Sequence, residues 1–189
     1  MNITESFMVD RSITEVWNLF KDVPEVARCL PGAELTEDHG DGTFAGALAV
    51  NLGPISSSFT GEATVTTNDD NFRMEIVGKG VDRSGGSQGR VTVEVTLLNS
   101  DSDSTDVRID AHVTLAGPIA QFGRTGLVAE VSKRLINDFA ECLHAKLSAV
   151  SVEESSKIQA GEVKGFSLLF AGLWTWIQNL FRRGPASSD

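Results

Sequence analysis

The sequence predicts an α+β domain in which a curved antiparallel sheet of about six or seven strands wraps around a long C-terminal helix. Three observations support this fold class. A short strand and two short helices open the chain, segments of alternating polarity fill residues 33–117, and a helical pattern occupies residues 118–147. A separate amphipathic helix is expected close to the C-terminus.

The first thirty residues predict a strand followed by two short helices. Residues 3–9 alternate between apolar and polar side chains, as in a strand with one buried face. Ser12 and Glu15 then form a capping-box pattern ahead of apolar residues at helical spacing. Pro24 predicts the start of a second short helix, which we expect to end at Pro31 and Gly32.

Residues 33–117 have the pattern of an antiparallel meander. Apolar residues recur at every second position, for example within residues 91–97 and 107–115, so each predicted strand has one apolar face. Turn signals such as Asp41-Gly42 and Gly85-Gly86 separate these segments.

A long helix is expected between residues 118 and 147. One stripe of that helix holds Gly123, Leu127, Val131, Leu135, Phe139 and Leu143. Together with the preceding elements this describes the helix-grip layout, which leaves a space between the concave sheet face and the helix. Glycines such as Gly61, Gly78 and Gly80 would keep the space open, although bends and close backbone packing also explain them.

The apolar faces of these elements point to a common interior, where we expect a ligand-binding cavity. The predicted lining residues are Phe20, Leu30, Phe44, Leu48, Phe59, Met74, Ile76, Phe122, Leu127 and Val131. Backbone amides or hydroxyl groups within residues 53–57 would donate hydrogen bonds near the mouth, although a tight turn is the plainer explanation of Gly53-Pro54.

Charge and cysteine content restrict the protein's class. The net charge of -10 lies on the first 148 residues, because residues 149–189 hold equal numbers of acidic and basic side chains. Such a surface repels phosphate backbones and excludes a nucleic-acid partner. Cys29 and Cys142 lie among apolar neighbours, so we expect buried thiols and neither a disulfide nor a metal pair. The N-terminus lacks a secretory signal pattern, which favours the reducing cytosol.

No catalytic site is expected. His39, His112 and His144 have no catalytic motif around them, and the sequence has neither a nucleotide-binding loop nor metal-ligand spacing. Asp82 and Arg83, at a strand end, are the charges expected near the cavity mouth, with a structural salt bridge as the plainer explanation. The sequence therefore predicts a non-catalytic protein without a metal or a covalently bound cofactor.

Three short motifs carry a resemblance to a known family. They are Leu-Pro-Gly-Ala-Glu at residues 30–34, Leu-Gly-Pro-Ile at 52–55 with Phe59 and Gly61, and Ala-Gly-Pro-Ile-Ala-Gln-Phe-Gly-Arg at 116–124. With these motifs, residues 3–147 resemble the G-subunit family of carbon monoxide dehydrogenase, a family of START-like (SRPBCC) proteins. The resemblance implies a non-catalytic accessory of a molybdenum-containing carbon monoxide dehydrogenase or a related oxidoreductase. It also implies a non-covalently held lipophilic ligand, for which a lipid or a respiratory quinone such as menaquinone is the candidate.

The C-terminal region predicts a membrane anchor. We expect a helix-grip domain at residues 1–148, a flexible linker at 149–162, an amphipathic helix at 163–183 and a disordered tail at 184–189. The apolar face of that helix and its flanking bases comprise Phe166, Leu169, Phe170, Leu173, Trp174, Trp176, Ile177, Leu180, Phe181, Arg182 and Arg183. These residues favour a helix lying in the interface of an anionic membrane over a spanning helix. Packing onto the protein's own domain or onto a partner is the alternative.

These features together predict a carrier of a lipophilic molecule at the cytoplasmic face of the cell membrane. One alternative is a recruitment or assembly adaptor for the oxidoreductase that holds no ligand. Another is a START-like enzyme that acts on a hydrophobic substrate.

Overall fold

An antiparallel sheet of seven strands forms the body of the molecule. The computed structural model describes residues 1–52, 55–101, 103–124 and 127–149. Within them the strands are β1 (Asn2–Val9), β2 (Ala33–Asp38), β3 (Thr43–Leu52), β4 (Ile55–Asn68), β5 (Arg73–Asp82), β6 (Ser87–Asp101) and β7 (Ser104–Ala116). Their order is β1-β7-β6-β5-β4-β3-β2, so the predicted meander is confirmed and the first strand returns to pair with the last.

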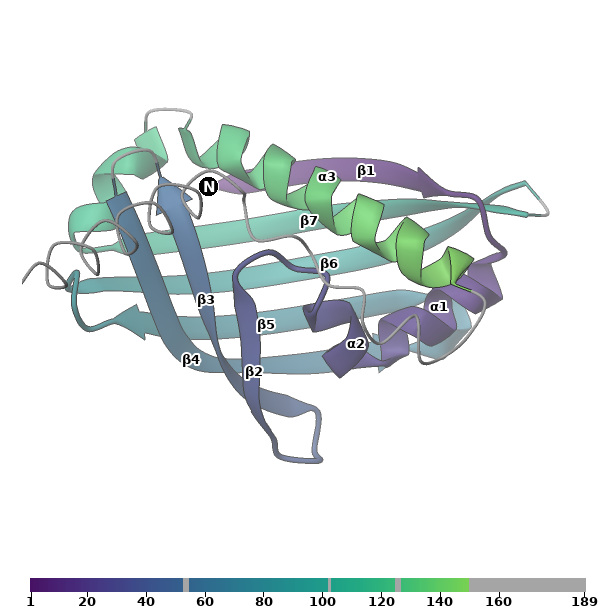
Figure 1. Cartoon of the computed structure of the whole chain (residues 1–189), viewed down its shortest axis with the longest axis horizontal. Coiled ribbons are helices and arrows are strands. Elements are labelled where there is room, and N and C mark those ends of the chain that lie inside the picture. Colours follow the sequence, from purple (N-terminus) through teal and green to yellow (C-terminus); the bar gives the residue numbers. More distant parts are fainter. Residues whose placement is uncertain (53–54, 102, 125–126, 150–189) are drawn as a thin grey trace, which may run out of the picture.

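The helices lie against this sheet. Helices α1 (Ile13–Lys21) and α2 (Val23–Ala27) follow β1, and α3 (Leu127–Ser148) crosses the sheet in front of β6, β7 and β1 (Figure 1). The α+β helix-grip arrangement is therefore confirmed. No helix within the described residues is long and apolar enough to cross a membrane.

The long helix begins later than the sequence pattern suggested. Residues Pro118–Arg124 form a separate 3-10 helix, and α3 starts only at Leu127. Two glycines, Gly123 and Gly126, fall in this region, and glycine is about 1 kcal/mol less favourable than alanine inside a helix. The helical stripe continues beyond the glycines, which is why the sequence pattern alone did not reveal the break.

Local hydrogen bonds fix the entry from β1 into α1. Ser12 Oγ accepts the backbone N–H of Glu15 at 3.4 Å, and Glu15 Oε2 accepts the N–H of Ser12 at 3.1 Å. The predicted capping box is thus present, and it satisfies backbone donors that have no partner inside the helix.

Two apolar clusters occupy the two ends of the space between sheet and helices. The larger one joins α1, the end of β1 and the second half of α3, with Phe139 in edge contact with Phe7 and Phe20. The smaller one joins Ile119 and Val128 near the start of α3. The cavity described below lies between these two clusters.

Candidate ligand-binding cavity

A cavity of about 510 Å³ lies between the inner face of the sheet and helices α2 and α3. Its walls are almost wholly apolar, and they include members of both apolar clusters, such as Phe20 and Phe139 at one end and Ile119 and Val128 at the other. A volume and wall composition of this kind are typical of sites for small lipophilic molecules.

Glycines on the inner face of the sheet contribute to the cavity in two different ways. A Cβ atom on Gly61 would lie 1.9 Å from the carbonyl oxygen of Lys79, so Gly61 is needed for close packing of β4 against β5. The nearest atoms to a Cβ atom on Gly89 would belong to the side chains of Phe59 and Leu115, at 3.6 Å or more. Gly89, which was not among the glycines predicted from the sequence, therefore leaves room that a side chain would otherwise occupy, whereas Gly61 fits the alternative explanation of close backbone packing.

The structure brings most of the predicted lining residues together in the wall of this one cavity. They are Phe20, Leu30, Phe44, Leu48, Phe59, Met74, Ile76 and Val131. The side chains of Phe122 and Leu127 fall outside what the structure describes. Whether these residues bind a ligand stays a prediction.

The predicted donors at residues 53–57 are not among the described cavity residues. Ser57 is 6% exposed but does not line the cavity, and Gly53 and Pro54 lie outside the described residues.

Asp82 and Arg83 do not stand at the cavity mouth as a salt bridge. Asp82 is 2% exposed, and its Oδ1 accepts hydrogen bonds from Ser84 Oγ at 2.7 Å and from the N–H of Gly85 at 2.9 Å. These bonds, with that of Gly85 first, hold the pKa of Asp82 below its usual range. Asp82 therefore stabilises the turn between β5 and β6, while Arg83 is exposed.

Two polar residues of the cavity wall, Glu5 on β1 and Ser132 on α3, are missing from the sequence prediction. Both could have been found from periodicity. Glu5 alternates with outward-facing neighbours as Ile3 and Phe7 do, and Ser132 lies four residues after Val128 and four before Ile136, on the cavity-facing side of α3.

None of the histidines His39, His112 and His144 lines the cavity. His112 on β7 contacts Asn2 at 2.7 Å, and His144 on α3 contacts the carbonyl oxygen of Met8 at 2.9 Å. Both contacts connect β1 to a neighbouring element and are structural. Among the described residues no group of three or more His, Cys, Asp or Glu side chains could hold a metal ion.

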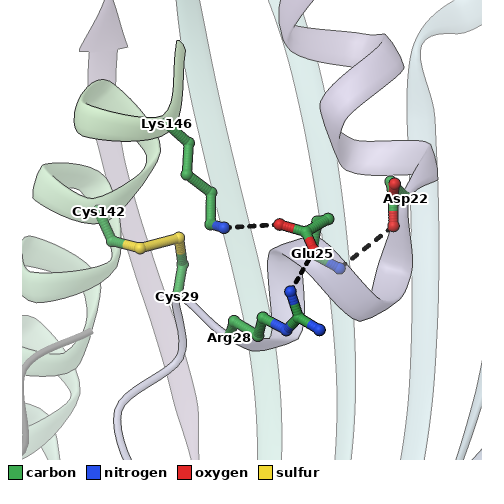
Figure 2. Close-up of polar contacts among 6 residues, drawn as sticks. All are labelled: Asp22, Glu25, Arg28, Cys29, Cys142 and Lys146. Atoms are coloured by element: carbon green, nitrogen blue, oxygen red, sulfur yellow. Dashed lines mark hydrogen bonds and ion pairs between the residues drawn. A yellow bond between two sulfur atoms is a disulfide. The ribbon is translucent and has the colours of Figure 1, made fainter. Parts of the chain in front are cut away.

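The two cysteines form a disulfide, so the expectation of buried thiols is wrong. Cys29, just after α2, is bonded to Cys142 on α3 (Figure 2). Both residues are buried, as expected, but sequence neighbours gave no sign that positions 113 residues apart would meet. No free cysteine is found in the described part of the chain.

A buried ion pair lies beside this disulfide. The ammonium group of Lys146 on α3, whose side chain is 0% exposed, lies 2.7 Å from Glu25 Oε2 on α2, and Glu25 also pairs with Arg28 (Figure 2). We call the disulfide Cys29–Cys142 and the ion pair Glu25–Lys146 the α2–α3 clasp. It joins two elements whose side chains, including Val26 and Ile136, line the cavity.

The predicted membrane-binding residues, from Phe166 to Arg183, lie outside the described residues, as do the linker and the tail. Helix α3 ends at Ser148, the residue at which the predicted domain ends. The anchor therefore stays a prediction from the sequence.

Comparison with known proteins gives one family match and several structural neighbours. Residues 6–148 match the family model that describes the G subunit of carbon monoxide dehydrogenase (CoxG). No curated protein sequence matches the chain.

The structural neighbours have a similar fold at low sequence identity. A conserved protein of Geobacillus kaustophilus has a TM-score of 0.68 at 17% identity, with 78% of this chain and 95% of that chain covered. The protein TTHA0849 of Thermus thermophilus has a TM-score of 0.57 at 15% identity, with 79% and 100% covered. The Zhui aromatase/cyclase of Streptomyces sp. R1128 has a TM-score of 0.56 at 16% identity, with 79% and 96% covered. At such identities the likeness concerns the fold alone.

Proposed function

Because this chain belongs to the CoxG family, the G-subunit family of carbon monoxide dehydrogenase, we propose that it is a non-catalytic carrier of a lipophilic ligand. The ligand is a respiratory quinone such as menaquinone, and the protein served is a molybdenum carbon monoxide dehydrogenase or a related oxidoreductase. The carrier works at the cytoplasmic face of the cell membrane, to which residues 163–183 attach it.

The single observation that carries this proposal is the apolar cavity of about 510 Å³. Burial of apolar ligand surface yields about 25 cal/mol per Å², so walls of this kind favour a ligand that is mostly hydrocarbon. A flat quinone ring suits aliphatic and aromatic walls such as Leu48, Phe59 and Met74. The volume of the cavity is enough for a drug-sized molecule, so a long isoprenoid tail would extend beyond it.

A mobile carrier would serve a dehydrogenase by lifting the quinone out of the bilayer. Electron transfer to a membrane-dissolved acceptor needs that acceptor to reach a soluble enzyme, and an apolar cavity shields the ring and part of the tail from water. The amphipathic segment at residues 163–183 would keep the carrier at the membrane surface while it exchanges ligand.

An enzyme acting on a hydrophobic substrate is the second candidate, since an aromatase/cyclase shares the fold. The cavity has few side chains that could take part in catalysis, because its inward-facing lining residues are apolar apart from Glu5 and Ser132. The third candidate is a recruitment or assembly adaptor that holds no ligand.

Organic extraction and native mass spectrometry of the purified full chain test the carrier directly. We expect a co-purifying quinone or lipid at up to one molecule per chain, released by solvent, and rebinding of menaquinone in displacement of the neutral fluorescent probe N-phenyl-1-naphthylamine. A chain that yields no lipophilic molecule and does not bind the probe would be an adaptor, and turnover of a hydrophobic substrate would identify an enzyme.

A further inference from the structure

Two polar side chains interrupt the apolar wall of the cavity. In β1 the residues Ile3, Glu5, Phe7 and Val9 share the inward face, and Glu5 lines the cavity. In α3 the residues facing the cavity are apolar apart from Ser132, whose hydroxyl group is the one hydroxyl among the described lining residues.

The other charged residues that border the cavity do not direct their charges into it. Glu62 and Lys79 alternate with inward-facing glycines and pair with each other on the outer face of the sheet at 3.2 Å. Arg90 on β6 and Glu34 on β2 also border the cavity and are likewise exposed. The charges of these four residues are therefore open to solvent.

Glu5 and Ser132 have no partner within the described part of the protein. Neither side chain forms a hydrogen bond or an ion pair with any residue that the structure describes. Both residues are partly buried, and their polar atoms are not fully shielded from solvent, so these atoms are available to a ligand in the cavity.

The contacts between α3 and β1 place both residues in the same part of the cavity. Ile3 packs against the cluster that contains Val128, and the ring of Phe7 meets that of Phe139 at 6.2 Å. About 13 Å of strand separates Ile3 from Phe7, and the helix from Val128 to Phe139 is similar in length, at about 16 Å. The middle of α3, which includes Ser132, therefore runs alongside Glu5.

The chemistry of this pair determines which ligand suits it. A carboxylate only accepts hydrogen bonds, whereas a serine hydroxyl both donates and accepts. A phenol or hydroquinone can donate its O–H to Glu5 and accept from Ser132. A ketone, an ether or a quinone has only acceptor oxygens and would direct lone pairs at the carboxylate.

We propose that Glu5 and Ser132 form the polar end of the ligand site and select amphiphiles whose buried end carries a hydrogen-bond-donating hydroxyl group. This inference rests on the proposed carrier function and refines it: the carrier would bind both forms of the quinone that it exchanges, and it would hold the reduced, hydroxyl-bearing form more tightly than the oxidised form. Hydrogen bonds to charged groups are strong enough to favour the donor form about tenfold or more.

Two probes that differ in one donor test the proposal without redox chemistry. 4-Octylphenol and 4-octylanisole share an apolar tail and a ring, and each competes with bound N-phenyl-1-naphthylamine on the full chain. We expect the phenol to bind roughly tenfold more tightly than the anisole. In Glu5→Gln the amide can also donate to an ether, so the preference should fall to about twofold or less.

Further variants separate specificity from general effects. Ser132→Ala should weaken the binding of both probes, because either oxygen can accept from the Ser132 hydroxyl, and should leave most of the preference for the phenol in place. Glu75→Gln, the same change at an exposed position on the outer face of β5, should keep the wild-type preference.

Equal binding of the two probes by the wild type, or an unchanged preference in Glu5→Gln, would overturn the selective site and leave the carrier intact. Failure of both probes and of menaquinone to displace the fluorophore would overturn the carrier itself, and this proposal with it.

Discussion

Cys29 and Cys142 are joined by a disulfide that links the end of α2 to α3 across 113 residues of sequence. Together with the Glu25–Lys146 ion pair, this bond holds two walls of the cavity together, one carrying Leu30 and the other Phe139. Disulfides persist mainly in oxidising environments. The cysteines therefore give no support to the proposed cytoplasmic location.

Removing the disulfide should lower the free energy of unfolding substantially. A cross-link that closes a loop of about 100 residues is worth roughly 4–5 kcal/mol in the chain-entropy model. We expect Cys29→Ala/Cys142→Ala, or the wild type with reductant, to unfold at a clearly lower urea concentration than the oxidised wild type. Two thiols titrated in the denatured, unreduced protein, or identical unfolding with and without reductant, would contradict the bond.

The Glu25–Lys146 pair should show a measurable coupling energy because Lys146 is buried. A double-mutant cycle of Glu25→Gln and Lys146→Met is expected to give about 1–3 kcal/mol in urea unfolding. The exposed pair Glu62–Lys79, measured with the same substitutions, serves as the control and should give about 0–1 kcal/mol. Equal coupling energies in the two pairs would show that burial of Lys146 does not strengthen its interaction with Glu25.

Filling the cavity should abolish ligand binding while the fold is kept. In Gly89→Leu the nearest neighbours of the new Cβ atom are side-chain atoms at ordinary contact distances and the rest of the side chain extends toward the cavity, so we expect a melting temperature near that of the wild type. Binding of N-phenyl-1-naphthylamine should fall at least tenfold, and Leu48→Trp should act in the same way. Normal binding by both variants would show that the probe binds elsewhere.

Gly61→Ala provides the opposite case. Its new methyl group would lie 1.9 Å from the carbonyl oxygen of Lys79, so β4 and β5 would have to separate. We expect this small substitution to lower the melting temperature far more than the larger one at Gly89. The reverse ranking would contradict the assignment of Gly61 to strand packing.

Much of this architecture follows from sequence periodicity, because alternation along a strand depends only on which face is buried. The strands, the capping box of Ser12 and the apolar lining around Phe59 and Met74 are local consequences of that rule. The same rule would have placed Glu5 inside, since it falls between Ile3 and Phe7 on the inward face. Glu5 is absent from the predicted lining because a charged residue does not fit the apolar pattern from which the cavity wall was predicted.

Long-range pairing could not be obtained from the sequence in this way. The disulfide and the burial of Lys146 both depend on where α2 lies relative to α3, which no local pattern encodes. The start of α3 was missed for a related reason, because apolar residues before and after Gly123 continue one stripe across a break in the helix.

Asp82 should contribute to stability in a pH-dependent way. Its pKa is lowered in the folded protein by the N–H of Gly85 and the hydroxyl of Ser84, relative to about 3.9 in an unfolded chain. The stabilisation is therefore complete above the unfolded pKa and is lost as the pH falls through the folded pKa. Asp82→Asn should be less stable than the wild type at pH 7, with a difference that shrinks below about pH 4. Thermal melts from pH 7 to pH 2 measure this, and Asp10→Asn, at an exposed position, should show little difference throughout.

Residues 163–183 are expected to bind the domain to anionic membranes. Deletion of residues 163–189 should leave a soluble domain that no longer sediments with vesicles containing phosphatidylglycerol, because the apolar face of the predicted helix is lost. Trp174→Glu/Trp176→Glu should have nearly the same effect, since a charge on that face is costly in the interface. Thr175→Glu/Gln178→Glu adds the same charge on the polar side of the predicted helix and should keep most of the binding. Persistent sedimentation of the truncated chain would show that another part of the protein contacts the membrane. Equal loss of binding in the two double variants would show that the added negative charge, and not its position on the helix, causes the loss.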